Sequence, residues 1–174
     1  MTFQIPDHLP DRLTITLWDF SWFTQTTPGE PFDDLDRAFA EARERGYNTV
    51  RICAMPLTLF GGDDAPGPLR IANLGRGFGQ GTRWYNNAGG ATLDGREHLL
   101  ALFRAAARHD CYIIVSSWEY QQTPSFFATS EQYDRLVAIP PRERCTALGE
   151  AMSRLVDFCK ENGVADRIAY VELH

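Results

Sequence analysis

Apolar residues along this chain fall into two patterns, short continuous runs and longer stretches with helical spacing. The short runs are rich in β-branched or aromatic residues and cover Leu13 to Trp18, Asn48 to Ala54, Cys111 to Ser117 and Ile168 to His174. Short apolar runs of this kind are typical of buried strands. Because a helical pattern precedes each of the last three, the chain is predicted to alternate strands with helices.

The helical stretches carry recognisable start and stop signals. Asp33 to Arg45 has apolar residues at i, i+3, i+4 and i+7 and is followed by a glycine. Asp94 to His109 opens with a capping box. A short helix at Ser130 to Val137 and a longer one between Pro141 and Gly163 complete the predicted elements.

Short links between such elements force parallel strands, right-handed crossovers and a sequential strand order. The predicted fold class is therefore α/β, with residues 1–174 forming one domain of about four βα units. A complete (β/α)8 (TIM) barrel needs roughly 250 residues. The chain is thus predicted to be a partial TIM barrel, the N-terminal half.

One segment interrupts this regularity. Residues 57–92 hold more than half of the 14 glycines of the chain and include Gly75 to Gly81, which superficially resembles a dinucleotide-binding fingerprint. No strand leads directly into that run and the residues after it are a poor helix start, so no nucleotide cofactor is predicted. Because the segment follows the second strand, we expect a long glycine-rich loop over the rim of the sheet.

Charge and hydropathy exclude several classes of partner. The net charge is −6 and basic residues are scattered, which disfavours nucleic acid. No apolar run approaches the roughly 20 residues needed to cross a bilayer, and residues 1–12 lack the apolar core of a signal peptide. A cytoplasmic protein is predicted.

Cysteine and histidine positions give no sign of a metal centre. Cys53 and Cys111 lie in apolar runs, and Cys145 and Cys159 lie on one apolar helical stripe, so all four are expected to be buried thiols. They show no zinc spacing. No metal or cofactor is predicted.

The residues that follow the strands are unusually aromatic and polar. Ligands of parallel α/β folds collect outside the carboxyl ends of strands. Aromatic faces suit sugar rings, and polar groups satisfy ring hydroxyls. The candidate ligand-binding residues are Trp18, Arg51, Trp84, Trp118, Glu119, Tyr120, Gln121 and His174. Core packing is the alternative for the tryptophans.

Two acidic residues have possible roles beside these candidates. Alternation along the last strand places Glu172 on the same face as Tyr170 and His174, where it could meet Arg51 in the interior. That pair would be structural, or Arg51 would hold a catalytic carboxylate ionised. Glu119 is the candidate for a general acid; the alternative is that this strand-end Glu only binds a ligand or a loop.

Several segments, taken in their order along the chain, resemble segments of one protein family. Gly46 to Ile52 is similar to the second strand of cellulase-like glycoside hydrolases with (β/α)8 barrels, and Ile168 to His174 is similar to their fourth. Thr82 to Asn87 and Ser116 to Gln122 resemble segments of a bacterial cellulase-like branch. The resemblance covers nearly the whole chain and implies that Arg51 supports the catalytic centre.

The resemblance also implies where catalysis would occur. In that family an Asn-Glu pair directly follows the fourth strand and supplies the acid/base, and a Glu near the end of the seventh strand is the nucleophile. Both would lie beyond His174. We therefore expect an N-terminal fragment of a hydrolase of carbohydrate metabolism, acting on O-glycosidic bonds of a β-glycan or oligosaccharide, that is inactive as 174 residues.

Two other functions fit the same sequence. One is a noncatalytic carbohydrate-binding half-barrel that dimerises to close its sheet. The other is an independent α/β domain that binds a different small molecule. Because exposed parallel edges promote association, self-association through the open sheet edges is expected.

Overall fold

A central parallel sheet organises the protein, as the predicted fold class requires. The computed structural model describes residues 5–17, 20–62, 67–72, 89–117 and 130–174, with side chains in the last range from residue 134 onward. Its main sheet has the order β1-β2-β5-β6. The four strands, all parallel, are β1 (Ile15–Thr16), β2 (Thr49–Cys53), β5 (Tyr112–Ser116) and β6 (Ile168–Glu172). The predicted parallel direction and sequential order are confirmed.

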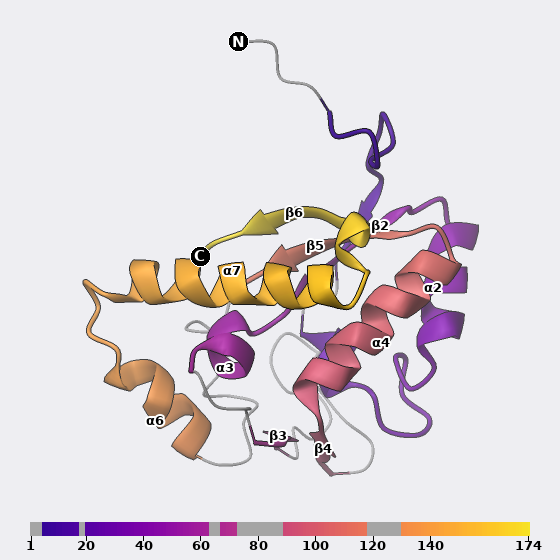
Figure 1. The fold of residues 1–174 in the computed structure, drawn as a ribbon. Helices are drawn as coiled ribbons and strands as arrows, with labels where there is room; N and C mark the ends of the chain where they lie inside the picture. The colour runs from indigo at the N-terminus through magenta and orange to yellow at the C-terminus, as the bar shows by residue number, and fades with distance from the viewer. Residues whose placement is uncertain (1–4, 18–19, 63–66, 73–88, 118–129) are drawn as a thin grey trace.

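Three helices cover one face of this sheet (Figure 1). They are α2 (Leu35–Glu44), α4 (Gly95–Arg108) and α7 (Arg144–Glu161). Each lies between two strands of the main sheet in the chain, which is the arrangement of repeated βαβ units. A shorter helix, α6 (Ser130–Ala138), precedes α7. Four βα-type strands with helices on a single face correspond to part of a barrel.

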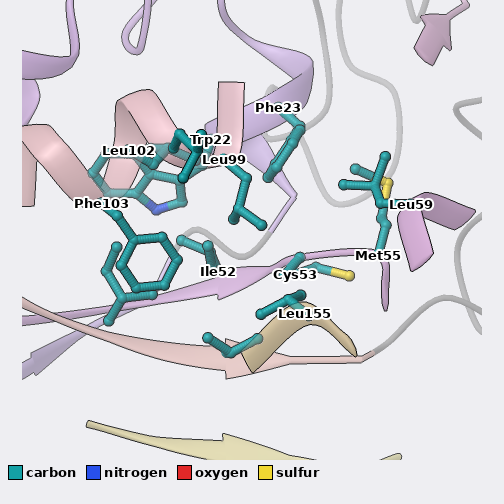
Figure 2. Packing of buried hydrophobic residues seen from close by; sticks show 14 of the residues in the cluster. Trp22, Phe23, Ile52, Cys53, Met55, Leu59, Leu99, Leu102, Phe103 and Leu155 are labelled. Carbon is teal, nitrogen blue, oxygen red and sulfur yellow. The ribbon is translucent and has the colours of Figure 1, made fainter. Parts of the chain in front are cut away.

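The core lies between the sheet and these helices. Val50, Ile52, Ile113 and Val115 alternate with residues of the opposite face, and all four are fully buried. Aromatic and aliphatic side chains from the helices complete this cluster (Figure 2), among them Leu102, Phe103 and Leu155. Burial of this face favours one register between β2 and β5, whereas the pairing of β5 with β6 is irregular between Ile113 and Ile114.

The helix boundaries follow from their capping residues. The Asp34 carboxylate accepts a hydrogen bond from the main-chain N–H of Arg37, and Asp94 caps the N–H groups of Arg96 and Glu97. Such caps satisfy N–H groups that have no partner within the helix. At the other end of α2, Gly46 has φ +86°, a conformation that glycine adopts without strain.

The opposite face of the sheet is only partly covered. Ile15 and Leu17 at β1 are 40% and 47% exposed, and Tyr170 of β6 is 41% exposed. These residues point away from the helices because they alternate with the core positions. In a closed barrel this face would be the interior.

Several short elements were not predicted. They are α1 (Ser21–Thr24), α3 (Pro56–Phe60), the 3-10 turn η1 (Ala165–Arg167), and the antiparallel pair β3 (Leu69–Ile71) and β4 (Ala91–Leu93). Three of them, α3, β3 and β4, overlap the predicted loop 57–92, so the described residues of that segment include regular structure. Each is five residues or shorter, too short for hydrophobic periodicity to show.

The prediction for the cysteines was wrong at one position. Cys53, Cys111 and Cys159 are buried, but Cys145 is exposed. Cys145 lies in the first turn of α7, before Leu148, the first buried residue of that helix. Burial raises the pKa of the Cys111 thiol to about 11 and that of Cys159 to about 12, so both remain protonated.

Candidate functional site

The carboxyl ends of the four parallel strands meet at one edge of the sheet, and the candidate site is built there. Parallel direction and sequential order bring the ends of β2, β5 and β6 side by side. The register pairs Cys53 with Ser116 and Ser116 with Glu172. Side chains at these positions share the face that points away from the helices.

Arg51 and Glu172 form an ion pair across this face. The Arg51 Nε lies 2.7 Å from the Glu172 Oε2, and the two side chains are 15% and 24% exposed. They come from β2 and β6, so the pair spans the intervening strand β5. This confirms the predicted partner of Arg51. Because both groups are largely withdrawn from water, each depends on the other for compensation of its charge.

His174 extends this cluster at the end of β6. Its Nε2 lies 3.4 Å from the Glu172 Oε2, the same oxygen that faces Arg51. Its main-chain N–H donates to the Ser117 hydroxyl at 2.9 Å. That hydrogen bond ties the end of β6 to the residue that follows β5. Arg51, Glu172 and His174 are therefore held in a fixed arrangement.

Ser116 places a further polar group among these residues. Its side chain is fully buried, and its hydroxyl has no hydrogen-bond partner among the residues that the structure describes. Buried hydroxyls are usually hydrogen-bonded. Ser116 lies between Cys53 and Glu172 in the register of the sheet, so its hydroxyl lies on the same face as the ion pair.

Tyr170 provides an aromatic surface beside the ion pair. It pairs in register with Ile114, which pairs with Arg51, so all three share one face. Burial, together with the nearby Glu172 charge, raises the pKa of the phenol, and Arg51 partly offsets this. Tyr170 therefore keeps its proton at neutral pH. It was not among the predicted site residues, although strand alternation placed it on the face of Glu172.

The short helix α3 directly follows β2 and borders the candidate site on that side. Met55 has φ +48° and turns the chain from β2 into α3. The Arg96 Nε donates to the Leu59 oxygen at 2.9 Å, and the Arg154 Nε donates to the Phe60 oxygen at 2.6 Å. These arginines satisfy the carbonyl groups at the end of α3 that have no partner within the helix. Helix α3 is thereby attached to both α4 and α7.

Most of the predicted site residues lie outside the described part of the chain. These are Trp18, Trp84, Trp118, Glu119, Tyr120 and Gln121. Of the predicted set, the structure brings Arg51 and His174 together, with Glu172 between them. The roles proposed for the other residues stay predictions.

The chemistry of this edge suits a polar ligand with apolar faces. It offers an exposed phenol ring, a guanidinium, a carboxylate and an imidazole, which can stack on a ring and exchange hydrogen bonds with hydroxyls. Glu172 is the only carboxylate within the four strands of the described sheet. Hydrolysis by a retaining glycosidase needs two carboxyl groups about 5–5.5 Å apart, so these strands alone do not supply the pair.

Two other kinds of site are absent from the described residues. No group of three or more His, Cys, Asp or Glu side chains in that part of the chain could hold a metal ion. No helix described in the structure is both long and apolar enough to span a membrane.

Comparisons with known proteins bear on the fold and on the ligand. The model of the cellulase-like family, described as sugar-binding cellulase-like, matches residues 15–171. The chain is similar to the crystal structure of a candidate glycoside hydrolase from Parabacteroides distasonis, with a TM-score of 0.68 and 23% identity. The match covers 92% of this chain and 37% of that one. A search of curated proteins finds no match.

Proposed function

Because the chain belongs to the sugar-binding cellulase-like family, we propose that the edge built by Arg51, Glu172, His174 and Tyr170 binds a carbohydrate as part of a glycoside hydrolase site. The observation that carries this proposal is the Arg51–Glu172 pair beside an exposed tyrosine ring. A charged pair next to an aromatic face is a suitable surface for a sugar ring.

Each group has a separate role in the proposed binding. The Tyr170 ring stacks on the apolar face of the sugar, and its protonated hydroxyl donates a hydrogen bond. Glu172 fixes the position of the Arg51 guanidinium, which interacts with polar groups of the ligand. His174 contacts the same oxygen of Glu172 and limits the movement of that carboxylate. Arg51 and Glu172 orient the ligand and do not themselves break a bond.

We place the pair of catalytic carboxylates outside this chain. The described strands supply one carboxylate, Glu172, and its closest charged neighbour is an arginine. That carboxylate is already engaged in the ion pair, and a retaining glycosidase needs a second carboxyl group about 5–5.5 Å away. The O-glycosidic bond of a β-glycan or oligosaccharide would then be cleaved only when further βα units complete the site. We also retain the predicted cytoplasmic location, which cell fractionation tests.

Binding can be tested with a matched pair of variants. Tyr170 and Val171 are each 41% exposed on the same strand but point to opposite faces. Isothermal titration of the chain with cello-oligosaccharides should show binding that Tyr170→Ala weakens by about tenfold, equivalent to about 1.4 kcal/mol. Val171→Ala should leave the affinity unchanged. Equal effects of the two substitutions, or no binding at all, would rule out this site.

A reducing-sugar assay tests the catalytic part of the proposal. The purified chain should release no product from β-glycans. Release of product that survives Glu119→Gln and Glu172→Gln would show that other carboxylates in the chain are catalytic. The second candidate function is a noncatalytic carbohydrate-binding module. It is favoured if the chain binds the sugar but does not hydrolyse it even when further βα units are added.

A further inference from the structure

Two arginines, Arg96 of α4 and Arg154 of α7, meet at the end of the short helix α3. The Arg96 Nε donates to the Leu59 oxygen at 2.9 Å, and the Arg154 Nε donates to the Phe60 oxygen at 2.6 Å. The two acceptors belong to consecutive residues, and consecutive carbonyl oxygens of a helix are about 3–4 Å apart. Side chains of two long helices are therefore brought to one small area.

Neither guanidinium forms an ion pair with a carboxylate in the described part of the chain. Arg37, Arg45 and Arg108 show the contrasting arrangement, since each pairs with an aspartate or a glutamate. Arg96 and Arg154 are partly buried and face neutral carbonyl groups instead. Two positive charges thus lie close together without compensation by any described carboxylate, although the net charge of the chain is −6.

Most N–H groups of these two guanidiniums remain available to a ligand. A guanidinium carries five N–H donors. Among the described residues, only the Nε–H of each arginine has a protein acceptor, so the Nη groups are left for other acceptors. Because the Nε hydrogen bonds already hold both side chains in place, little side-chain entropy is lost when a ligand binds.

The ring of Phe60 supports both arginines. The Arg96 Cζ lies 4.7 Å from the centre of this ring. The ring also packs against Phe158, with centroids 5.3 Å apart, and Phe158 follows Arg154 by one turn of α7. Phe60 is only 3% exposed and has little freedom to move. The two guanidiniums are therefore attached to a fixed apolar base.

The space beyond Phe60 is open to a ligand. Gly61 and Gly62 follow it directly, and both are exposed. A Cβ at Gly62 would have no heavy atom within 4 Å. No side chain of these two residues needs to be displaced when an anion approaches the arginine pair.

We propose that Arg96 and Arg154 bind the phosphate group of a small ligand. A phosphate group carries about −1.5 to −2 charges at neutral pH, which matches two guanidiniums better than the single charge of a carboxylate does. Its oxygens accept several N–H groups at once, and the planar guanidinium binds phosphate through two parallel hydrogen bonds. The site is built from α3, α4 and α7, and the proposal does not depend on carbohydrate binding by Arg51 and Glu172.

Isothermal titration of the full 174-residue chain with inorganic phosphate, at neutral pH and constant ionic strength, tests this site. Arg96→Gln and Arg154→Gln should each weaken phosphate binding by about tenfold. Glutamine carries its amide N–H at the same position along the side chain as the arginine Nε, so it removes the charge and keeps a donor for the α3 carbonyl group. Circular dichroism of each variant confirms that it folds.

Arg104→Gln is the matched control. Arg104 is an exposed residue of α4, about two turns after Arg96. Its replacement removes the same charge at a distance from the site and should change the phosphate affinity by less than about twofold. Acetate, which carries a single charge, should bind at least about tenfold more weakly than phosphate.

A third titration identifies the source of the phosphate group. Tighter binding of a hexose 6-phosphate than of inorganic phosphate would identify a phosphate ester as the ligand, and equal affinities would identify the free ion. Either result supports the site when Arg96→Gln weakens the binding of both compounds.

Three results would overturn the proposal. They are the absence of binding heat up to about 20 mM phosphate, equal weakening by Arg96→Gln and Arg104→Gln, and phosphate binding that appears only in the double variant Asp63→Asn/Asp64→Asn. These two aspartates follow Gly62 in the sequence and lie outside the described residues. The third result would mean that carboxylates of the chain itself occupy the arginine pair.

Discussion

The Nε2 of His98 lies 2.6 Å from the main-chain oxygen of Trp22, and this contact joins α4 to α1. The imidazole also meets the Phe23 ring edge-on, with ring centroids 4.9 Å apart. Because the partner is a carbonyl oxygen, the neutral ring donates from Nε2. Burial lowers the pKa of His98, and the hydrogen bond to Trp22 opposes this only in part.

Because His98 is buried, we expect the free energy of unfolding to decrease in mild acid. The unfolded histidine has a pKa of 6.5 and the folded one lies lower, so between these values the unfolded chain binds more protons. The free energy of unfolding should therefore be constant with respect to this group above pH 6.5 and decrease as the pH falls below it. Urea unfolding between pH 8 and about pH 5 measures this slope.

Two variants isolate the contribution of His98 to that slope. His98→Gln should flatten the slope, because the titrating group is removed. His8→Gln replaces an exposed histidine of the N-terminal segment and should leave the pH dependence of stability unchanged. An unchanged slope in His98→Gln would assign the acid sensitivity to other groups.

Two helical glycines should respond in opposite directions to alanine. A Cβ at Gly95 would lie 2.4 Å from the Leu59 Cδ2, and Leu59 is only 1% exposed and so has little room to move. Gly95→Ala should lower the unfolding free energy by about 1–3 kcal/mol. Gly149, inside α7, has nothing within 4 Å of its Cβ position, so Gly149→Ala should raise stability by about 0.5–1 kcal/mol. Stabilisation by both substitutions would contradict the packing described here.

The Arg51–Glu172 pair should behave as a coupled unit. Arg51→Met leaves the Glu172 carboxylate, 24% exposed, without the guanidinium at 2.7 Å and should cost about 2–3 kcal/mol. Adding Glu172→Gln should recover about 1–2 kcal/mol of that loss, as a double-mutant cycle would measure. Arg43→Met is the control: its contact with Asp110 is 3.8 Å long between exposed side chains, so it should change stability by less than about 0.5 kcal/mol. Additive effects at Arg51 and Glu172 would show that the pair is not coupled.

Self-association should depend on the edge of β6. Val171 and Leu173 are 41% and 53% exposed at this strand, and an unprotected edge pairs with other chains. The apparent mass of the free protein should rise with concentration, and Val171→Lys should suppress the rise. Val137→Lys is the control, because Val137 of α6 has a similar exposure of 39%. This substitution should not suppress the rise in apparent mass. Equal suppression by both variants would indicate a general effect of charge.

The architecture of the sheet was predictable because it follows from simple periodicities. Runs of apolar residues located β2, β5 and β6, and short connections fixed their parallel order. Alternation along β6 was enough to pair Glu172 with Arg51. These features depend on repeated local patterns, each of which spans several residues.

Features that depend on single conformations or distant packing were not predictable. Nothing in the sequence near Met55 indicates a left-handed backbone, which a buried methionine rarely adopts. The β3–β4 pair joins three-residue strands across a long separation in the chain. Exposure of Cys145 depends on where α7 first meets the core, and apolar spacing along a helix does not show this.

The two arginines that hold α3 have a consequence for ligand recognition. Since Arg96 and Arg154 anchor the same short helix from different directions, that side of the sheet edge cannot shift without disturbing both longer helices. A ligand arriving next to β2 would thus meet a rigid boundary. The shape of ligand accepted next to α3 is therefore set by the side chains that line it, and motion of the backbone contributes little.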